Sequence, residues 1–154
     1  MARPKFELPT DESVGYLVRS LHRSFNRVLA QRIAHANLTN AQWFFLRALW
    51  ENNFISQREL SNSIGLTEPT TVSALKIMEK NGLIQRKRDT KDARRVIVRL
   101  TRKGQRLKDR LLPCAYEINQ VALKGISAGE IRQLKQLLLR MRKRLEEEAT
   151  KSKL

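Results

Sequence analysis

The stretch that decides the fold covers residues 56–82 and reads SQRELSNSIGLTEPTTVSALKIMEKNG. Ser56, with Glu59 three residues later, forms a capping box, the pattern that opens a helix. Gly65 ends this helix, because glycine accepts the left-handed backbone conformation of a tight turn. Thr67 then caps a second helix. The stretch therefore predicts two helices joined by a tight turn.

The period of the apolar residues changes immediately after this helix pair. Residues 83–88 and 95–100 alternate with a period of two, which is typical of β-strands. The polar segment 89–94 joins them into a charged hairpin. Two helices followed by a hairpin are the order of a winged helix-turn-helix, whose second helix enters the major groove of DNA.

Longer helices are predicted on both sides of this centre. Apolar residues spaced three and four apart over residues 14–33 indicate an N-terminal helix. Capping residues at Thr39, Thr101 and Ser127 open three more helices. The apolar faces of the terminal helices exceed what one small domain can cover, so we expect a two-fold homodimer.

The predicted fold class is mainly α with a small β-wing. We expect an N-terminal arm and dimerisation helix over residues 1–37, followed by a winged helix-turn-helix DNA-binding domain over residues 38–104. Residues 105–154 are predicted to form C-terminal dimerisation helices.

The charge of the chain indicates a polyanionic partner. The 154 residues include 31 Lys and Arg against 15 Asp and Glu, a net charge of +16. Residues 83–106 contain ten basic and two acidic residues, so half of this charge lies in 24 positions around the hairpin. Nucleic acid, an anionic membrane surface and an acidic protein all fit this charge, and the order of elements favours duplex DNA.

Several classes of protein are disfavoured by the composition. A single cysteine, Cys114, rules out an internal disulfide framework and a zinc-finger cage. No apolar run is long enough to span a membrane, and no signal peptide is recognisable, so we expect a cytoplasmic protein without membrane partners. The two histidines are distant and show no metal spacing, and no nucleophile elbow or phosphate-cradling loop is present. We therefore expect no enzyme activity, cofactor or metal.

The candidate DNA contacts lie on the helix pair and the hairpin. Small polar side chains at the start of the second helix can bond bases or phosphates, and arginines of the hairpin can enter a narrow minor groove. The candidates are Ser56, Gln57, Thr67, Glu68, Thr70, Thr71, Ser73, Lys76, Arg86, Arg88, Arg94 and Arg95. The alternative is that the hydroxyls only cap the helix and that the arginines only protect a sheet edge from aggregation.

Five motifs resemble those of the MarR-type transcriptional regulators, and the resemblance covers nearly the whole chain. They are Leu38-Thr39-Asn40-Ala41-Gln42-Trp43, Ser56-Gln57-Arg58-Glu59-Leu60, Thr67-Glu68-Pro69-Thr70-Thr71-Val72, Met78-Glu79-Lys80-Asn81-Gly82-Leu83-Ile84, and Asp92-Ala93-Arg94 continuing to Leu100-Thr101-Arg102-Lys103-Gly104. The resemblance implies a homodimer that binds a pseudo-palindromic operator, usually as a repressor. It also assigns the wing Asp and Arg of the family to Asp92, as a positioning residue, and Arg94.

The resemblance further implies regulation by a small effector between the DNA-binding lobe and the dimerisation helices. Arg19, His22, Trp43 and Arg47 are the candidate ligand residues, since Arg or His can hold a carboxylate while Trp covers an aromatic ring. A phenolic or other aromatic carboxylate, or its coenzyme A thioester, is the expected effector. A structural role for His22 and a core position for Trp43 are the alternatives.

Two other functions remain open from the sequence. A non-specific architectural DNA-binding protein would share the charge without needing the ordered helix pair. A redox-sensing repressor would use Cys114, although this residue lies among apolar neighbours that favour an inert, buried thiol.

Overall fold

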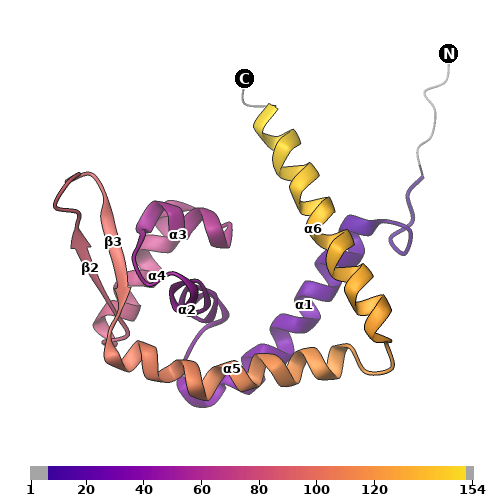
Figure 1. Ribbon diagram of the computed structural model, residues 1–154, viewed down its shortest axis with the longest axis horizontal. Helices are drawn as coiled ribbons and strands as arrows, with labels where there is room; N and C mark the ends of the chain where they lie inside the picture. The colour runs from indigo at the N-terminus through magenta and orange to yellow at the C-terminus, as the bar shows by residue number, and fades with distance from the viewer. Residues whose placement is uncertain (1–6, 152–154) are drawn as a thin grey trace. The chain divides into compact units, whose positions relative to one another are not determined.

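The computed structural model describes residues 7–151. Its chain divides into two units, one ending at Ile118 and the other beginning at Asn119, and helix α5 runs across the boundary. The elements are α1 (Val14–Ile33), η1 (Ala34–Ala36), α2 (Asn40–Glu51), β1 (Ile55–Ser56), α3 (Gln57–Ile64), α4 (Glu68–Lys80), β2 (Ile84–Arg88), β3 (Val96–Leu100), α5 (Arg102–Ala122) and α6 (Ala128–Lys151) (Figure 1). The mainly α fold with a small β-wing is confirmed.

The helices begin where the capping residues predict. Complete capping boxes open α2 at Thr39 and α3 at Ser56, and the hydroxyl of Thr67 accepts a hydrogen bond at the start of α4. Gly65 ends α3 with φ 71°, in the left-handed region that favours glycine. Because these signals are local, the helix-turn-helix follows directly from the sequence.

The wing is a three-stranded antiparallel sheet in the order β1-β3-β2. The two hairpin strands pair from Ile84 opposite Leu100 to Arg88 opposite Val96. The short strand β1 adds only two residue pairs along the other edge of β3. The hairpin is therefore anchored to the chain segment that leads directly into α3.

Two apolar clusters hold the first unit together. One fills the winged helix-turn-helix with Phe45, Leu46, Leu49, Leu60, Leu75, Met78, Leu83, Ile84, Val98 and Leu100. The other joins α1, α2 and α5 through Leu29, Ile33, Trp43, Leu111 and Ile118. The DNA-binding elements therefore rest on a continuous base of α1, α2 and the first part of α5.

The first turn of α5 lies against the wing with no side chain between them. Gly104 faces the backbone carbonyl of Leu83 so closely that a Cβ atom would collide with it. The carbonyl of Gly104 accepts a hydrogen bond of 3.1 Å from Nε1 of Trp50. The hydroxyl of Thr101 donates to the carbonyl of Gly82 at 2.6 Å. This joint fixes the direction in which α5 leaves the sheet.

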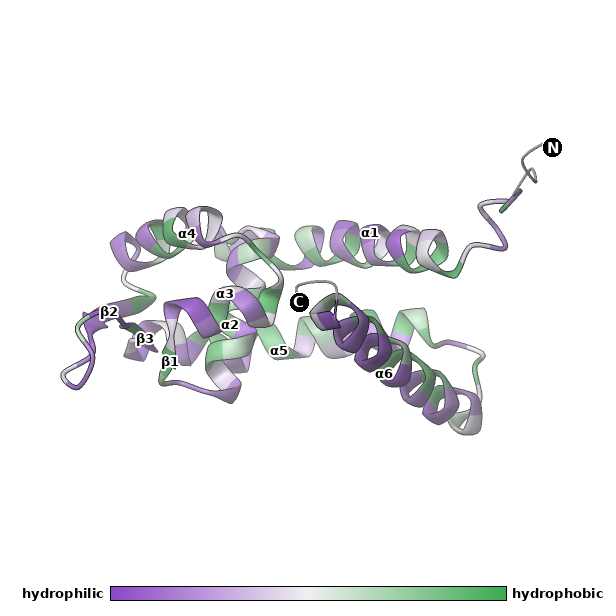
Figure 2. Cartoon of the chain, turned by 90° about the horizontal axis from the view of Figure 1, so that it is seen from above, coloured by the Kyte–Doolittle hydropathy of each residue, from purple (hydrophilic) through white to green (hydrophobic). Residues whose placement is uncertain are grey.

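Apolar side chains remain exposed on α1 and α6, where Figure 2 shows hydrophobic residues in green. On α1 they include Val14, Leu17 and Leu21, and on α6 Leu137 and Leu145. None of the residues of α6 that the structure describes is buried. Among residues 7–151, no helix is long and apolar enough to cross a membrane.

Candidate nucleic-acid interface

Helix α4 has one buried face and one open face. Leu75 and Met78 are fully buried against the core, at the spacing of one helical turn. Five of the predicted contact residues are exposed around the start and along the open face of the helix: Thr67, Glu68, Thr70, Ser73 and Lys76. Their side chains are therefore accessible to a groove of DNA.

Thr71 is a correction to the predicted contacts, because its side chain is fully buried. Its hydroxyl donates to Oγ of Ser61 at 3.1 Å, and Ser61 donates in turn to the carbonyl of Leu66 at 2.7 Å. This chain of hydrogen bonds joins α4 to the turn after α3. Thr71 therefore fixes the angle of the two helices and does not reach DNA.

Ser56 is also buried, and its hydrogen-bonding groups are already used. Its amide and its hydroxyl both donate to the carboxylate of Glu59, and its hydroxyl oxygen accepts from the amide of that residue. These bonds, with a smaller contribution from Arg95, hold the pKa of Glu59 below its ordinary value. The prediction of a Ser56 side-chain contact with DNA is thus corrected to a capping role.

Arg86 forms a clamp between the wing and α4. Its guanidinium donates to Glu79 at 2.9 and 3.1 Å, and its backbone amide donates to the same carboxylate at 2.9 Å. These bonds lower the pKa of Glu79. Gln57 accepts a longer bond of 3.5 Å from the same arginine. Arg86 already binds these partners and its side chain is 18% exposed, so it holds the wing to α4, and its contact with DNA stays a prediction.

Two aspartates shape the tip of the wing. Oδ1 of Asp92 accepts from the amide of Arg94 at 3.0 Å, and the carbonyl of Asp92 accepts from the amide of Arg95 at 2.9 Å. Oδ1 of Asp89 accepts from the amide of Lys91 at 2.9 Å. Such Asx turns fix a loop locally. Asp92 therefore holds the backbone that carries Arg94.

The two arginines at the tip differ in their partners. Arg95 donates to Glu59 of α3 at 3.2 Å. Among residues 7–151, no side chain or carbonyl binds the guanidinium of Arg94, which is exposed. Arg88, at the end of β2, is exposed as well. Arg94 is therefore available to an external anion without first breaking an ion pair.

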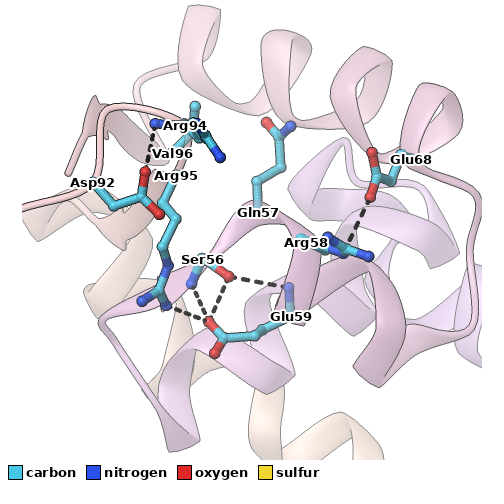
Figure 3. Close-up of a pocket in the computed structure, with 9 residues that line it drawn as sticks. All are labelled: Ser56, Gln57, Arg58, Glu59, Glu68, Asp92, Arg94, Arg95 and Val96. Atoms are coloured by element: carbon cyan, nitrogen blue, oxygen red, sulfur yellow. Dashed lines mark hydrogen bonds and ion pairs between the residues drawn. The ribbon is translucent and has the colours of Figure 1, made fainter.

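A hollow of about 590 Å³, called here the wing hollow, lies between these elements (Figure 3). It brings six of the predicted residues together with three others: Ser56, Gln57, Arg58, Glu59, Glu68, Asp92, Arg94, Arg95 and Val96. Arg58 pairs with Glu68 at 3.7 Å, and Figure 3 shows this pair across the hollow from Arg94. Arg58 and Glu59 are not among the DNA contacts predicted from the sequence, although the capping box at Ser56 predicts the helix start that places them.

A second cavity of about 520 Å³, called here the helix cavity, lies between α1, α2 and the end of α3. His22 stacks on Phe44 with ring centroids 6.4 Å apart, and its Nε2 lies 2.8 Å from Nδ2 of Asn26. Arg47 also lines the cavity, where it pairs with Glu51 at 3.7 Å. The helix cavity thus combines an aromatic wall with a cationic group.

Two of the predicted ligand residues do not line the helix cavity. Trp43 is 3% exposed and packs edge-on against Trp50 in the core, with ring centroids 5.7 Å apart. Arg19 is exposed on α1 outside the cavity lining. Phe44 supplies the aromatic surface expected of Trp43, because on α2 the neighbouring position faces the cavity. Arg19 and Trp43 are therefore replaced by Phe44 and Asn26 as candidates.

Cys114 is half-buried on α5 and is the only cysteine of the chain. Its Sγ lies 3.9 Å from the carbonyl oxygens of Arg32 and Arg110. With no second cysteine, a disulfide within one chain cannot form.

Comparison with known proteins agrees with this geometry. The model of the MarR family matches residues 38–96. The repressor NicR of Pseudomonas putida is 31% identical over 119 residues, which cover 77% of this chain and 75% of NicR. This chain belongs to the MarR family. As a MarR-type winged-helix protein, it is a DNA-binding transcriptional regulator.

Solved structures of MarR-type regulators share the fold. The structure of the transcriptional regulator SlyA has a TM-score of 0.82 and 28% identity, and covers 88% of this chain and 96% of its own. The structure of BpsR of Bordetella bronchiseptica has a TM-score of 0.76 and 26% identity, with coverages of 83% and 97%. The latter describes how 6-hydroxynicotinic acid regulates DNA binding by BpsR.

Proposed function

We propose that this MarR-type regulator is a homodimeric repressor that binds a pseudo-palindromic operator and is released by a small aromatic carboxylate. The open face of α4 would enter the major groove, and the wing would place Arg94 in the flanking minor groove. The observation that carries the proposal is the arrangement around the wing hollow, where an unpaired Arg94 lines the same hollow as Glu68 at the start of α4.

The other charged groups of the wing hollow suit backbone contacts. Arg58 and Arg95 each already pair with a carboxylate, at 3.7 and 3.2 Å, and both pairs are exposed. Exposed ion pairs of this kind are weak, so a phosphate can compete for the guanidinium groups. Glu68, at the start of α4, has the chemistry to accept a hydrogen bond from the amino group of a cytosine.

The dimer is supported by the exposed apolar side chains of α1 and α6. Leu17 and Leu21 on α1 are about half exposed, and Leu145 on α6 is 69% exposed. Apolar faces of this size on long helices are usually covered by a second copy of the chain. In such a dimer, two α4 helices would read half-sites about 34 Å apart, which is one turn of DNA.

The effector is proposed to bind in the helix cavity. The guanidinium of Arg47 suits a carboxylate, and the stacked rings of Phe44 and His22 suit an aromatic ring. The compound named for BpsR, 6-hydroxynicotinic acid, combines both groups, and a phenolic carboxylate or its coenzyme A thioester has related chemistry. Since the cavity lies where α1 meets α2 and α3, an occupant would change how the DNA-binding elements sit on α1.

Fluorescence anisotropy tests the DNA-binding part of this proposal. The chain is titrated onto DNA from upstream of its own gene and onto scrambled DNA, across a series of salt concentrations. We expect at least ~10³-fold tighter binding to the inverted-repeat site. Equal affinity for both DNAs at every salt concentration, followed by failure of a random-library selection to yield a preferred site, would support the architectural alternative instead.

The effector part has its own measurement. We expect 6-hydroxynicotinic acid to lower operator affinity more than its carboxamide does, because only the acid carries the charge that Arg47 can pair with. Equal effects of the acid and the amide would contradict the proposed role of Arg47. The proposed dimer is tested separately, by measuring the molar mass of the DNA-free protein by sedimentation.

A further inference from the structure

One apolar side chain stands on the open face of α4. Ile77 is 52% exposed, whereas Leu75 and Met78 on the neighbouring positions are fully buried. At 100° per residue, Ile77 lies almost in line with Ser73, one turn earlier, and near Lys80, both of which are exposed. The apolar spacing of the sequence alone suggests a core residue, but Ile77 falls outside the arc that faces the core.

Ile77 belongs to neither apolar cluster of residues 7–151, nor to the partly buried residues packed against these clusters. The side chains beside it on the open face are a hydroxyl at Ser73 and the ammonium groups of Lys76 and Lys80. At 100° per residue both lysines lie to the same side of Ile77, so this face of α4 presents an apolar group next to a basic edge, which suits a partner with an apolar group beside a phosphate strand.

We infer that Ile77 contacts the C5-methyl group of a thymine in each half-site and thereby selects T·A at that position. The inference rests on the proposed insertion of α4 into the major groove. In that groove the thymine methyl is the one apolar group that a base pair presents, and apolar side chains read it by contact. Lys76 and Lys80, which lie to one side of Ile77, are then placed toward the phosphates of one strand.

The position of the thymine relative to other contacts follows from helix geometry. Ile77 lies seven residues after Thr70, which corresponds to roughly 10 Å along the helix axis. Stacked base pairs are about 3.4 Å apart and the helix axis is inclined to the DNA axis, so the thymine is expected within about three base pairs of the pair that Thr70 contacts. The two-fold operator repeats it in the other half-site.

The test removes the methyl group from the thymine and truncates the side chain of Ile77. An operator is first selected from a random duplex library with the wild-type chain, and each thymine is then replaced singly by deoxyuridine, which differs only in the methyl. Wild-type affinity is expected to fall about fourfold at one thymine per half-site, from the loss of one buried methyl-sized contact. The Ile77→Ala variant is expected to bind the parent operator more weakly and to show no response at that thymine.

Two controls separate this effect from others. Ile77→Val keeps a branched apolar side chain and should retain most of the response to deoxyuridine. Lys76→Ala should weaken binding to all operators alike and keep the methyl response, since a phosphate contact carries no base information. Because Ile77 is half exposed, its truncation should leave the melting temperature unchanged, which shows that the fold is intact.

The outcomes distinguish this inference from the proposed function. If the selection returns a defined inverted repeat but the wild type and Ile77→Ala respond equally to every deoxyuridine, the inference is wrong and the operator-binding function stands. If the selection returns no preferred sequence, both are wrong.

Discussion

Nη2 of Arg95 lies 3.2 Å from Oε2 of Glu59, which joins the base of the wing tip to the first turn of α3. Both side chains are about half exposed, so the pair contributes little to the free energy of unfolding. Its importance is positional, because Glu59 is already fixed by Ser56 and the two residues after Asp92 form a tight turn. The pair therefore marks where the wing tip lies against α3 in the free protein.

Replacement of Arg94 by alanine tests the wing contact directly. Since no described residue pairs with this guanidinium, Arg94→Ala should leave the melting temperature unchanged and weaken operator binding by about 1–3 kcal/mol per half-site. Fluorescence anisotropy measures the loss. Arg132→Ala removes the same charge from α6 and serves as the control, and a similar loss in both variants would show a net-charge effect instead.

Replacement by asparagine separates the hydrogen-bond acceptor of the Asp92 side chain from its negative charge. Asp92→Asn keeps an oxygen that accepts from the amide of Arg94, so the turn and operator affinity should be retained. Asp92→Ala removes that acceptor and should weaken operator binding, because Arg94 is no longer held in one place. Fluorescence anisotropy measures the operator affinity of both variants. Equal affinities of Asp92→Asn and Asp92→Ala would argue against a positioning role of the Asp92 side chain.

Gly104 tolerates no side chain. A Cβ at this position would meet the backbone carbonyl of Leu83, and neither α5 nor β2 can yield without disturbing the core. Gly104→Ala should lower the free energy of unfolding by about 3 kcal/mol, which corresponds to a melting temperature lower by on the order of 10 °C. Gly129→Ala on α6 is the matched control, since its Cβ would meet only ordinary contacts at 3.9 Å. A stable Gly104→Ala protein would contradict the packing described.

The ion pair of Glu79 with Arg86 predicts a pH dependence. Because hydrogen bonds from Arg86 lower the pKa of Glu79 in the folded state, the stabilisation is fully present above the ordinary value of 4.5 and is lost as the pH falls through the lowered pKa. Glu79→Gln should therefore be less stable than the wild type at pH 7, and the difference should shrink in acid.

Urea unfolding at pH 7 and pH 3, at one fixed protein concentration, measures this difference. Glu146→Gln removes a carboxylate from α6 and gives the background effect of one charge. A difference between wild type and Glu79→Gln that stays constant with pH would rule out the charged pair as its cause.

Local signals explain what the sequence could predict. The start of each helix follows from a capping residue such as Thr39 or Ser56, which acts within three residues along the chain. The turn at Gly65 is equally local. These signals are sufficient to predict the winged helix-turn-helix, because its helices are short and the residues at their ends locate them along the chain.

The roles of Thr71 and Arg86 depend on partners in other elements. The buried Thr71 donates its hydrogen bond to Ser61, ten positions away, and the guanidinium of Arg86 is bound to Glu79, seven positions away. Neither partner is marked by a spacing rule. Trp43 and Phe44 are adjacent, and only the packing of α2 against α1 and α5 decides which ring is buried.

The contact of Gly104 with Leu83 has a mechanical consequence for regulation. Thr101 is hydrogen-bonded to Gly82, and Trp50 is hydrogen-bonded to Gly104. The start of α5 and the wing are therefore in close-packed contact. Close-packed joints transmit displacement, because they have no space in which to absorb it. In the proposed mode of DNA binding, a rotation of α5 about its axis would therefore move the hairpin, and Arg94 with it, without unfolding the wing.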